Sequence, residues 1–236
     1  MATRPTTWTP EGLVAERAAG APGQWRAFVD GACAVQDESS MLVARLLEAR
    51  PGETVIDACA APGTKTTHLA QLMDNRGRIV ALDPQPARLH RVSAAAARLG
   101  VSIVQTIEGT VQELVSSYAP RADAVLVDAP CTNLGVLRRN PEVKWRRRPE
   151  DIANSAARQS EILGAAATLV KAGGRLVYAT CSINRTENQD VRAGFLKTHP
   201  EFTPVPALPG WPDEVQLLPH QHGTDGFYIA ALKRKV

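Results

Sequence analysis

The sequence lacks the features of a membrane protein and of a secreted protein. No apolar run in its 236 residues reaches the ~18 residues that a membrane span needs. The opening stretch MATRPTTWTPEGL has neither an apolar segment nor a small-residue cleavage site, which argues against a secretory signal. We therefore expect a cytoplasmic protein with no membrane partner.

Cysteine is scarce, and its spacing is unlike that of a metal site. Four cysteines lie far apart without any CxxC pair: Cys33, Cys59, Cys131 and Cys181. A zinc site needs ligands at short spacing, and a disulfide framework is unusual in a reducing compartment. The close histidine pair, His220 and His222, has no cysteine or acid positioned to complete a site. We predict no metal, so the thiols serve either packing or chemistry.

Apolar strands alternate with helical segments from residue 36 onward. Hydrophobic residues make up 44% and charged residues 22%, as in an ordinary globular domain. We expect a shortened N-terminal segment over 1–35 and one catalytic domain over 36–236. The predicted strands are 54–60, 78–83, 102–107, 124–129 and 175–181, with a closing pair over 215–219 and 226–235. The predicted helices are 36–48, 65–73, 87–100, 150–174 and 186–199, the last with a Thr186/Gln189 capping box.

This alternation predicts a doubly wound, Rossmann-like α/β fold with a mostly parallel, seven-stranded sheet. Ligands of such folds bind at the carboxyl ends of the strands. Two of the predicted strands end there in a cysteine, in VLVDAPC at Cys131 and in LVYATCS at Cys181. We therefore expect the two thiols to share one pocket.

The loop after the first predicted strand, DACAAPGTKTTHL, favours a cofactor that contains ribose. It matches neither the phosphate loop GxxxxGK[ST] nor the dinucleotide pattern GxGxxG. Asp83 ends the second strand, 20 residues after Gly63, where an acid can accept hydrogen bonds from ribose hydroxyls. A ribose ligand without a pyrophosphate indicates S-adenosylmethionine. The alternative for Asp83 is a simple turn before Pro84.

A thiol pair beside a methyl donor suits methylation of cytosine at C5. A thiolate that adds to C6 makes C5 nucleophilic, and a second thiol can take part in the later elimination. Asp128 and Lys65 are placed to handle the charge that changes at N3 and at the exocyclic amine. The alternative is that both cysteines are inert packing residues. The chemistry alone leaves open which cysteine attacks.

Three motifs resemble those of the Sun-type RNA cytosine-5 methyltransferases, which include bacterial ribosomal-RNA enzymes and the eukaryotic Nop/Sun proteins. They are DACAAPGTKT, DAPCTNLGVLRRNPEVKWRRRPEDI and YATCSINRTEN. VQDESS at 35–40 and DGFYIAAL at 225–232 match as well, so the resemblance covers about residues 30–236. It implies RNA methylation, with ribosomal RNA favoured over transfer RNA.

The resemblance also implies a role for each motif residue. Cys181 is expected to be the nucleophile and Cys131 to assist product release, while Asp128 lies between cofactor and base. The residues expected to hold the cofactor are Cys59, Ala60, Ala61, Pro62, Gly63, Thr64, Lys65, Asp83, Arg88, Thr110 and Asp128.

The sequence departs from the family pattern in three places. Thr64 stands where a second glycine is usual, and Thr110 replaces an aspartate that normally accepts from the adenine amine. Only about 35 residues precede the catalytic core, where family members usually carry a longer RNA-binding extension. We therefore expect a separate specificity partner as one source of that surface.

A basic segment follows Cys131 directly. Net charge is only +3, but residues 138–148 hold six basic residues and one acid around Trp145. Its place at the mouth of the expected pocket favours nucleic-acid binding over a merely solvated loop. The predicted RNA-binding residues are Arg138, Arg139, Lys144, Trp145, Arg146, Arg147 and Arg148.

Two other functions remain open. A DNA cytosine-5 methyltransferase uses the cysteine of its PC motif as the nucleophile, which here is Cys131. A non-catalytic RNA-binding or assembly factor predicts weak cofactor binding with RNA binding retained. The presence of both cysteines together with Asp128 and Lys65 argues against this second alternative.

Overall fold

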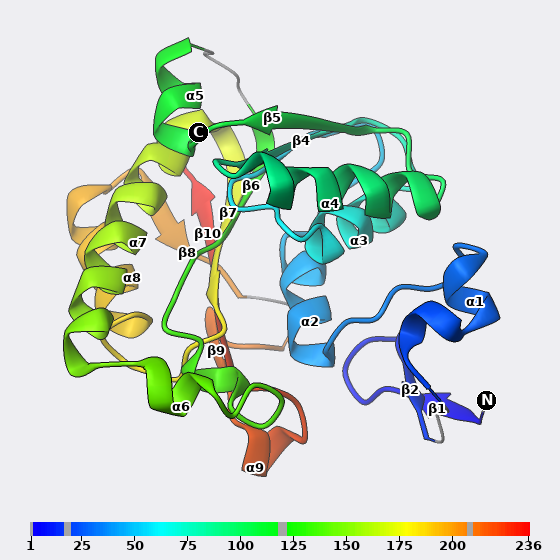
Figure 1. Ribbon diagram of the computed structural model, residues 1–236. Coiled ribbons are helices and arrows are strands. Elements are labelled where there is room, and N and C mark those ends of the chain that lie inside the picture. Colours follow the sequence, from blue (N-terminus) through cyan, green and yellow to red (C-terminus); the bar gives the residue numbers. More distant parts are fainter. Residues whose placement is uncertain (1, 17–19, 118–121, 207–209) are drawn as a thin grey trace.

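The computed structural model describes residues 2–16, 20–117, 122–206 and 210–236. Residues 1, 17–19, 118–121 and 207–209 lie outside the described residues. They belong to the two segments predicted from the sequence, 1–35 and 36–236. One large sheet forms the centre, with strand order β5-β4-β3-β6-β7-β10-β8 and with β9 also paired to β10 (Figure 1). Its strands are β3 (Thr54–Asp57), β4 (Arg78–Asp83), β5 (Val104–Glu108), β6 (Ala122–Asp128), β7 (Val170–Thr180), β8 (Phe202–Pro204), β9 (Glu214–Leu217) and β10 (Phe227–Arg234).

The sheet confirms the predicted mostly parallel, Rossmann-like arrangement. Neighbouring strands from β5 to β7 run parallel, and β10 is antiparallel to β7. Both β8 and β9 pair with β10, but with different halves of it. The seventh position of the sheet is therefore divided between two short strands, which makes eight strands in all.

Helices cover both faces of the sheet. In Figure 1, α5, α7 and α8 lie on one face, and α2, α3 and α4 lie on the other. Their bounds are α2 (Glu38–Leu46), α3 (Thr64–Leu72), α4 (Pro86–Arg98), α5 (Val111–Ser117), α7 (Pro149–Leu169) and α8 (Gln189–Thr198). Shorter helices are η1 (Pro22–Gln24), α1 (Arg26–Val29), η2 (Leu134–Val136), α6 (Val143–Arg146) and α9 (Pro219–His222). Within the described ranges, no helix is both long and apolar enough to cross a membrane.

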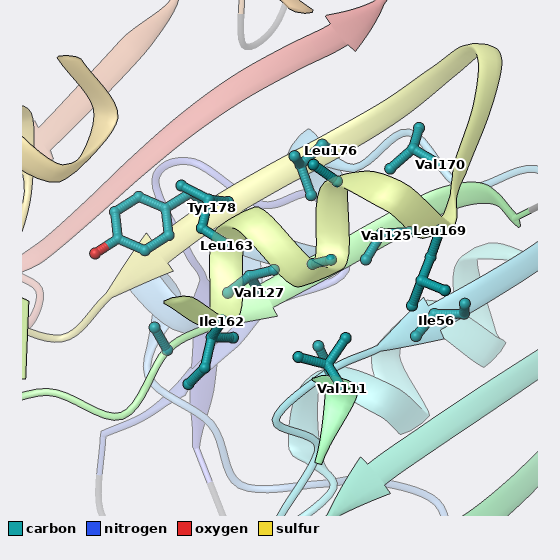
Figure 2. Packing of buried hydrophobic residues seen from close by; sticks show 14 of the residues in the cluster. Ile56, Val111, Val125, Val127, Ile162, Leu163, Leu169, Val170, Leu176 and Tyr178 are labelled. Atoms are coloured by element: carbon teal, nitrogen blue, oxygen red, sulfur yellow. The ribbon is translucent and has the colours of Figure 1, made fainter. Parts of the chain in front are cut away.

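The continuous apolar strands reflect burial on both faces. In β6, Val125 and Val127 pack toward α7, whereas Ala124 and Leu126 pack toward α2 and α3. Figure 2 shows the α7 side, where Leu163 lies against this sheet face. Burying each large aliphatic side chain stabilises the fold by ~1.5–3 kcal/mol. This packing fixes the strand ends that carry the polar residues.

Several element boundaries differ from the sequence prediction, and the first strand of the central sheet ends at Asp57 rather than at residue 60. The long helix α7 ends at Leu169, and β7 begins at Val170 rather than at 175. The predicted capping box of Thr186 is wrong, because α8 begins at Gln189 and its N-cap residue makes no side-chain cap bond. The side chains of Glu187 and Asn188 are fully buried, so the chain passes through the interior before the helix starts.

The N-terminal segment forms a small hairpin, with β1 (Thr3–Pro5) antiparallel to β2 (Leu13–Ala15). Glu11, between these strands, contacts His68 of α3 and Arg45 of α2, each at 2.7 Å. Arg98 at the end of α4 donates to the carbonyl oxygens of Phe28 and Cys33. Polar contacts thus attach this segment to the helices on one face of the sheet.

Candidate active site

The predicted chemical residues gather at one edge of the sheet. Asp57, Asp83 and Asp128 are the last residues of β3, β4 and β6, and Cys181 follows the end of β7. These four strands are parallel neighbours, so their carboxyl ends meet at the same edge. The topology therefore brings together residues that are more than 120 positions apart in sequence.

The loop from Cys59 to Gly63 joins β3 to α3. Gly63 has φ 105°, and a Cβ there would lie 2.9 Å from the Cα of Val92 in α4. Only glycine fits both that conformation and that close approach. Ala60 donates its N–H to Leu82 O at 2.8 Å, which holds the loop against the end of β4.

Asp57 is a buried carboxylate that the sequence analysis did not assign to the site. Its Oδ2 accepts from Thr66 Oγ1 at 2.7 Å, while its Oδ1 is buried without a hydrogen-bond partner among the described residues. Burial raises the pKa of Asp57 from 3.8 to about 6. An acidic residue at the end of an apolar strand is the only sequence signal for it.

Asp83 and Arg88 connect the loop to the second strand. Asp83 Oδ1 accepts from the backbone N–H of Gln85 at 2.9 Å, and Oδ2 lies 3.5 Å from a guanidinium nitrogen of Arg88. Arg88 also donates to Ala61 O at 3.1 Å. The structure therefore brings Asp83, Arg88 and the predicted loop together.

Two other predicted cofactor residues have local partners. The Thr110 hydroxyl lies 2.9 Å from Glu113 Oε2, at the start of α5. Cys59 packs against the buried cluster on the α7 side of the sheet. Burial raises the pKa of the Cys59 thiol, which keeps it neutral.

Lys65 and Asp128 form an ion pair at the centre of this edge. Lys65 Nζ lies 2.7 Å from Asp128 Oδ2, and the two side chains are 11% and 24% exposed. The same ammonium group lies 5.1 Å from the ring centroid of Phe227. The predicted proximity of these two residues is confirmed.

The two cysteines lie side by side, as the strand pattern predicted. β6 and β7 are hydrogen-bonded parallel neighbours, and the Sγ atoms of Cys131 and Cys181 are 3.3 Å apart. Both thiols are free. The hydrogen bond with Cys181, together with burial, raises the pKa of Cys131 well above its usual value. Cys131 is therefore held as a neutral thiol.

Asn133 and Glu187 lie beside this pair, and neither was predicted from the sequence. Asn133 Oδ1 accepts from Cys181 Sγ at 3.0 Å and from Cys131 Sγ at 3.4 Å. Glu187 is fully buried and accepts from the Thr132 backbone at 2.9 Å and from Ser182 Oγ at 2.6 Å. Its carboxylate also accepts from Gln159 and from the Thr132 hydroxyl. The nearness of Glu187 to the TC motif in sequence was the available signal.

The basic segment divides into inward and outward side chains. Arg138 and Arg139 pair with the buried carboxylate of Asp225. Arg147 donates to Thr132 O at 2.8 Å, while Trp145 is 82% exposed. Lys144 Nζ lies 5.3 Å from the Trp145 ring centroid.

A cavity of about 480 Å³ lies against this segment and reaches Asn133, which contacts both thiols. Its lining residues are Asn133, Asn140, Glu142, Val143, Arg146 and Arg147. No group of three metal-ligating side chains occurs within the described part of the chain. The site thus combines two thiols, an ion pair and a polar cavity.

The sheet has the Rossmann-like arrangement of S-adenosylmethionine-dependent methyltransferases. A family model described as 16S rRNA methyltransferase RsmB/F matches residues 44–233. The chain belongs to this family, which confirms the resemblance to the Sun-type enzymes.

Individual relatives agree with this assignment. The chain is 42% identical over 219 residues to the "probable ribosomal RNA small subunit methyltransferase B" of Bacillus subtilis, covering 88% of this chain and 49% of that protein. The solved structure of PH0851 is 37% identical with a TM-score of 0.92, covering 99% of this chain and 54% of that one. The structure of NSun6 from Pyrococcus horikoshii with SFG is 32% identical with a TM-score of 0.82, covering 92% and 56%. The chain spans about half the length of the curated relatives it matches.

Proposed function

We propose that this chain methylates C5 of a cytosine in ribosomal RNA, in the cytoplasm, through a covalent bond between Cys181 and C6. The observation that carries the proposal is the 3.3 Å separation of the Cys131 and Cys181 sulfurs at the ends of adjacent parallel strands. The Lys65–Asp128 ion pair lies at the same sheet edge. Membership of a 16S rRNA methyltransferase family supports ribosomal RNA as the substrate.

The residues at the ends of β3 and β4 suit S-adenosylmethionine, the methyl donor of this family. Asp57 Oδ1 is a buried acceptor without a partner among the described residues, which suits the ammonium group of the donor. Asp83 Oδ2 lies 3.5 Å from Arg88 and can accept from ribose hydroxyls. When bound, the donor supplies an electrophilic methyl group.

The two thiols take different roles in this proposal. The Cys181 sulfur loses its proton and forms the bond to C6, which turns the ring into an enamine that is nucleophilic at C5. In the later elimination the C5 proton passes to solvent, its electron pair forms the C5–C6 double bond, and the S–C6 bond breaks to release Cys181 as a thiolate. Cys131, whose raised pKa keeps it protonated, donates its S–H to this leaving thiolate. The Lys65–Asp128 ion pair places a positive and a negative group beside the edge of the cytosine that carries N3, where they balance the charge that changes during the reaction.

RNA approaches across the cavity beside α6. Trp145 offers an exposed ring for stacking a base, and Arg146 adds a positive charge to the cavity wall. A paired cytosine leaves its stem to reach Cys181. Arg138 and Arg139 are engaged with Asp225, which leaves fewer basic groups for phosphates than the segment contains. We therefore include a separate specificity partner in the proposal.

A cysteine replacement series tests this function. Wild type, Cys131→Ala and Cys181→Ala are incubated with ribosomal RNA and S-adenosylmethionine, with Cys33→Ala as a matched thiol control. A protein–RNA adduct that survives denaturing electrophoresis is expected to accumulate only with Cys131→Ala. Accumulation only with Cys181→Ala favours the DNA-type assignment of Cys131 as nucleophile. RNA binding without adduct or methyl transfer in any protein favours a non-catalytic factor.

A further inference from the structure

Asn133 holds both thiols through a single atom. Its Oδ1 lies 3.0 Å from Cys181 Sγ and 3.4 Å from Cys131 Sγ, while the two sulfurs are 3.3 Å apart. The three contacts share two S–H protons: Cys181 donates to the amide oxygen, and Cys131 donates either to the same oxygen or to the Cys181 sulfur. Neither the family assignment nor the proposed roles of the cysteines account for this side chain.

The backbone fixes the position of Asn133. Its φ is 63°, a left-handed conformation that asparagine tolerates better than most residues. Two positions later, Gly135 donates to Cys181 O at 2.9 Å and accepts from the N–H of Gly226 at 2.8 Å. A Cβ at Gly135 would lie 2.0 Å from Gly226 O, so the chains approach as closely as backbones can. The loop after Cys131 is thus pinned to the ends of β7 and β10.

Asn133 also lines the 480 Å³ cavity, together with Arg146 and Glu142. Its side chain therefore lies between the surface proposed for RNA and the two sulfurs. The Asn133 side chain therefore contacts the Cys181 sulfur even when no RNA is bound. This location suits a residue that controls the protonation state and the orientation of the Cys181 thiol.

We infer that Asn133 is a positioning residue that holds the Cys181 thiol by its amide oxygen and the Cys181 thiolate by its amide N–H. This inference rests on the proposed function of Cys181. When the S–H bond breaks, the proton passes to solvent and the electron pair stays on sulfur. A half-turn of the carboxamide then replaces the oxygen with an N–H donor, because asparagine carries both an acceptor and donors on one planar group.

Aspartate at this position separates the two functions. A carboxylate accepts from the thiol but has no donor for the thiolate, and its negative charge opposes a second one. Asparagine can serve both states of Cys181, whereas aspartate serves only the protonated state. The other titratable groups that interact with Cys131 are Glu187 and Tyr178, and both residues are retained in the Asn133→Asp variant.

The test measures the pH dependence of iodoacetamide alkylation at Cys181, read by peptide mass spectrometry on protein without RNA or cofactor. Asn133→Asp is expected to raise the pH midpoint by about one unit or more. Asn140→Asp is the control, because Asn140 lines the same cavity, whereas the amide that accepts from the two thiols is that of Asn133. An unchanged midpoint in Asn133→Asp, or an equal shift in Asn140→Asp, overturns the inference.

Asn133→Gly keeps the test decisive if the aspartate variant does not fold, since φ 63° suits glycine. Glycine removes both contacts, but the N–H bond to the charged thiolate is stronger than the bond from the neutral thiol to the amide oxygen. Cys181 alkylation at pH 7 is therefore expected to slow by about fivefold. An unchanged alkylation rate contradicts the inference. Alkylation requires neither RNA nor methyl donor, so its outcome is independent of the adduct experiment. If Cys131→Ala forms the adduct but Asn133→Asp leaves the alkylation midpoint unchanged, only the role of Asn133 is rejected. If the midpoint shifts but no adduct forms, the proposed RNA chemistry is rejected and the role of Asn133 stands.

Discussion

The hydroxyl oxygens of Thr132 and Ser182 lie 3.3 Å apart, and each residue directly follows one of the two cysteines. The buried carboxylate of Glu187 accepts hydrogen bonds from both residues. It thereby ties the loop after β6 to the loop after β7. The separation of the sulfurs depends on this connection as well as on the pairing of the strands.

Replacing Glu187 by glutamine is expected to loosen that connection. Glutamine keeps one acceptor oxygen and places an NH2 group where the other oxygen was, so either the Thr132 N–H and Gln159 or the hydroxyls of Thr132 and Ser182 lose their carboxylate acceptor. Leaving a buried group unsatisfied costs ~1–3 kcal/mol. We expect a loss of that order in the free energy of unfolding, measured by urea denaturation, together with slower adduct formation. Glu161→Gln, on the exposed face of α7, is the control. A Glu187→Gln protein as stable as this control would rule out the tie.

Asp57 makes stability depend on pH. Its pKa is about 6 in the folded protein against an ordinary 3.8, so the folded state binds the extra proton between these values. Its contribution to stability is complete below about pH 4 and is lost as pH rises through about 6. A shift from 3.8 to about 6 corresponds to about 3 kcal/mol.

Asp57→Asn removes this titration. Relative to wild type, the variant should gain about 2 kcal/mol in free energy of unfolding between pH 4 and pH 7, which is most of the full shift. Urea denaturation of both proteins across this range measures the difference, and effects that do not depend on pH cancel. A constant difference across the range contradicts burial as the cause of the raised pKa. The same variant should bind S-adenosylmethionine more weakly in calorimetry, because asparagine has no negative charge for the ammonium group and keeps only one acceptor oxygen, to which Thr66 can donate.

Sequence periodicity was sufficient for the fold and for the meeting of the cysteines. β-branched runs such as VLVDAPC indicated buried parallel strands, and parallel strands place their carboxyl ends together. The closeness of Cys131 and Cys181 followed from that rule alone. The division of the sheet edge between β8 and β9 could not be predicted, because strands of three and four residues are too short to show a clear alternation of apolar and polar residues.

The side-chain partners of the site could not be predicted in the same way. Asn133 and Cys181 are 48 residues apart, and Arg139 and Asp225 are 86 apart. Such pairs depend on the path of loops, for which a local pattern gives no signal. A run of arginines likewise cannot reveal which members are held by a buried carboxylate. The sequence therefore predicted the place of the site better than its internal contacts.

Lys65 and Asp128 are expected to act as a unit. They contact at 2.7 Å with little exposure, so removing one leaves the other with an uncompensated charge. Lys65→Met and Asp128→Asn should each slow single-turnover methyl transfer by about 100-fold. The double variant should be far less impaired than the product of the single effects. Multiplicative losses in this cycle would show that the two residues act independently.

Trp145 and Arg146 are expected to contribute to RNA binding by different physical means. Stacking of a base on the exposed Trp145 ring is worth ~1–3 kcal/mol and does not release counterions, so Trp145→Ala should weaken binding without changing its salt dependence. Arg146→Ala should reduce the slope of log affinity against log salt by about 0.7 for a single strand. Arg185→Ala, an exposed arginine outside the basic segment, is the control. Fluorescence anisotropy over a salt series gives both quantities. A changed slope in Trp145→Ala, or affinities equal to the control in both variants, would place the RNA elsewhere on the surface.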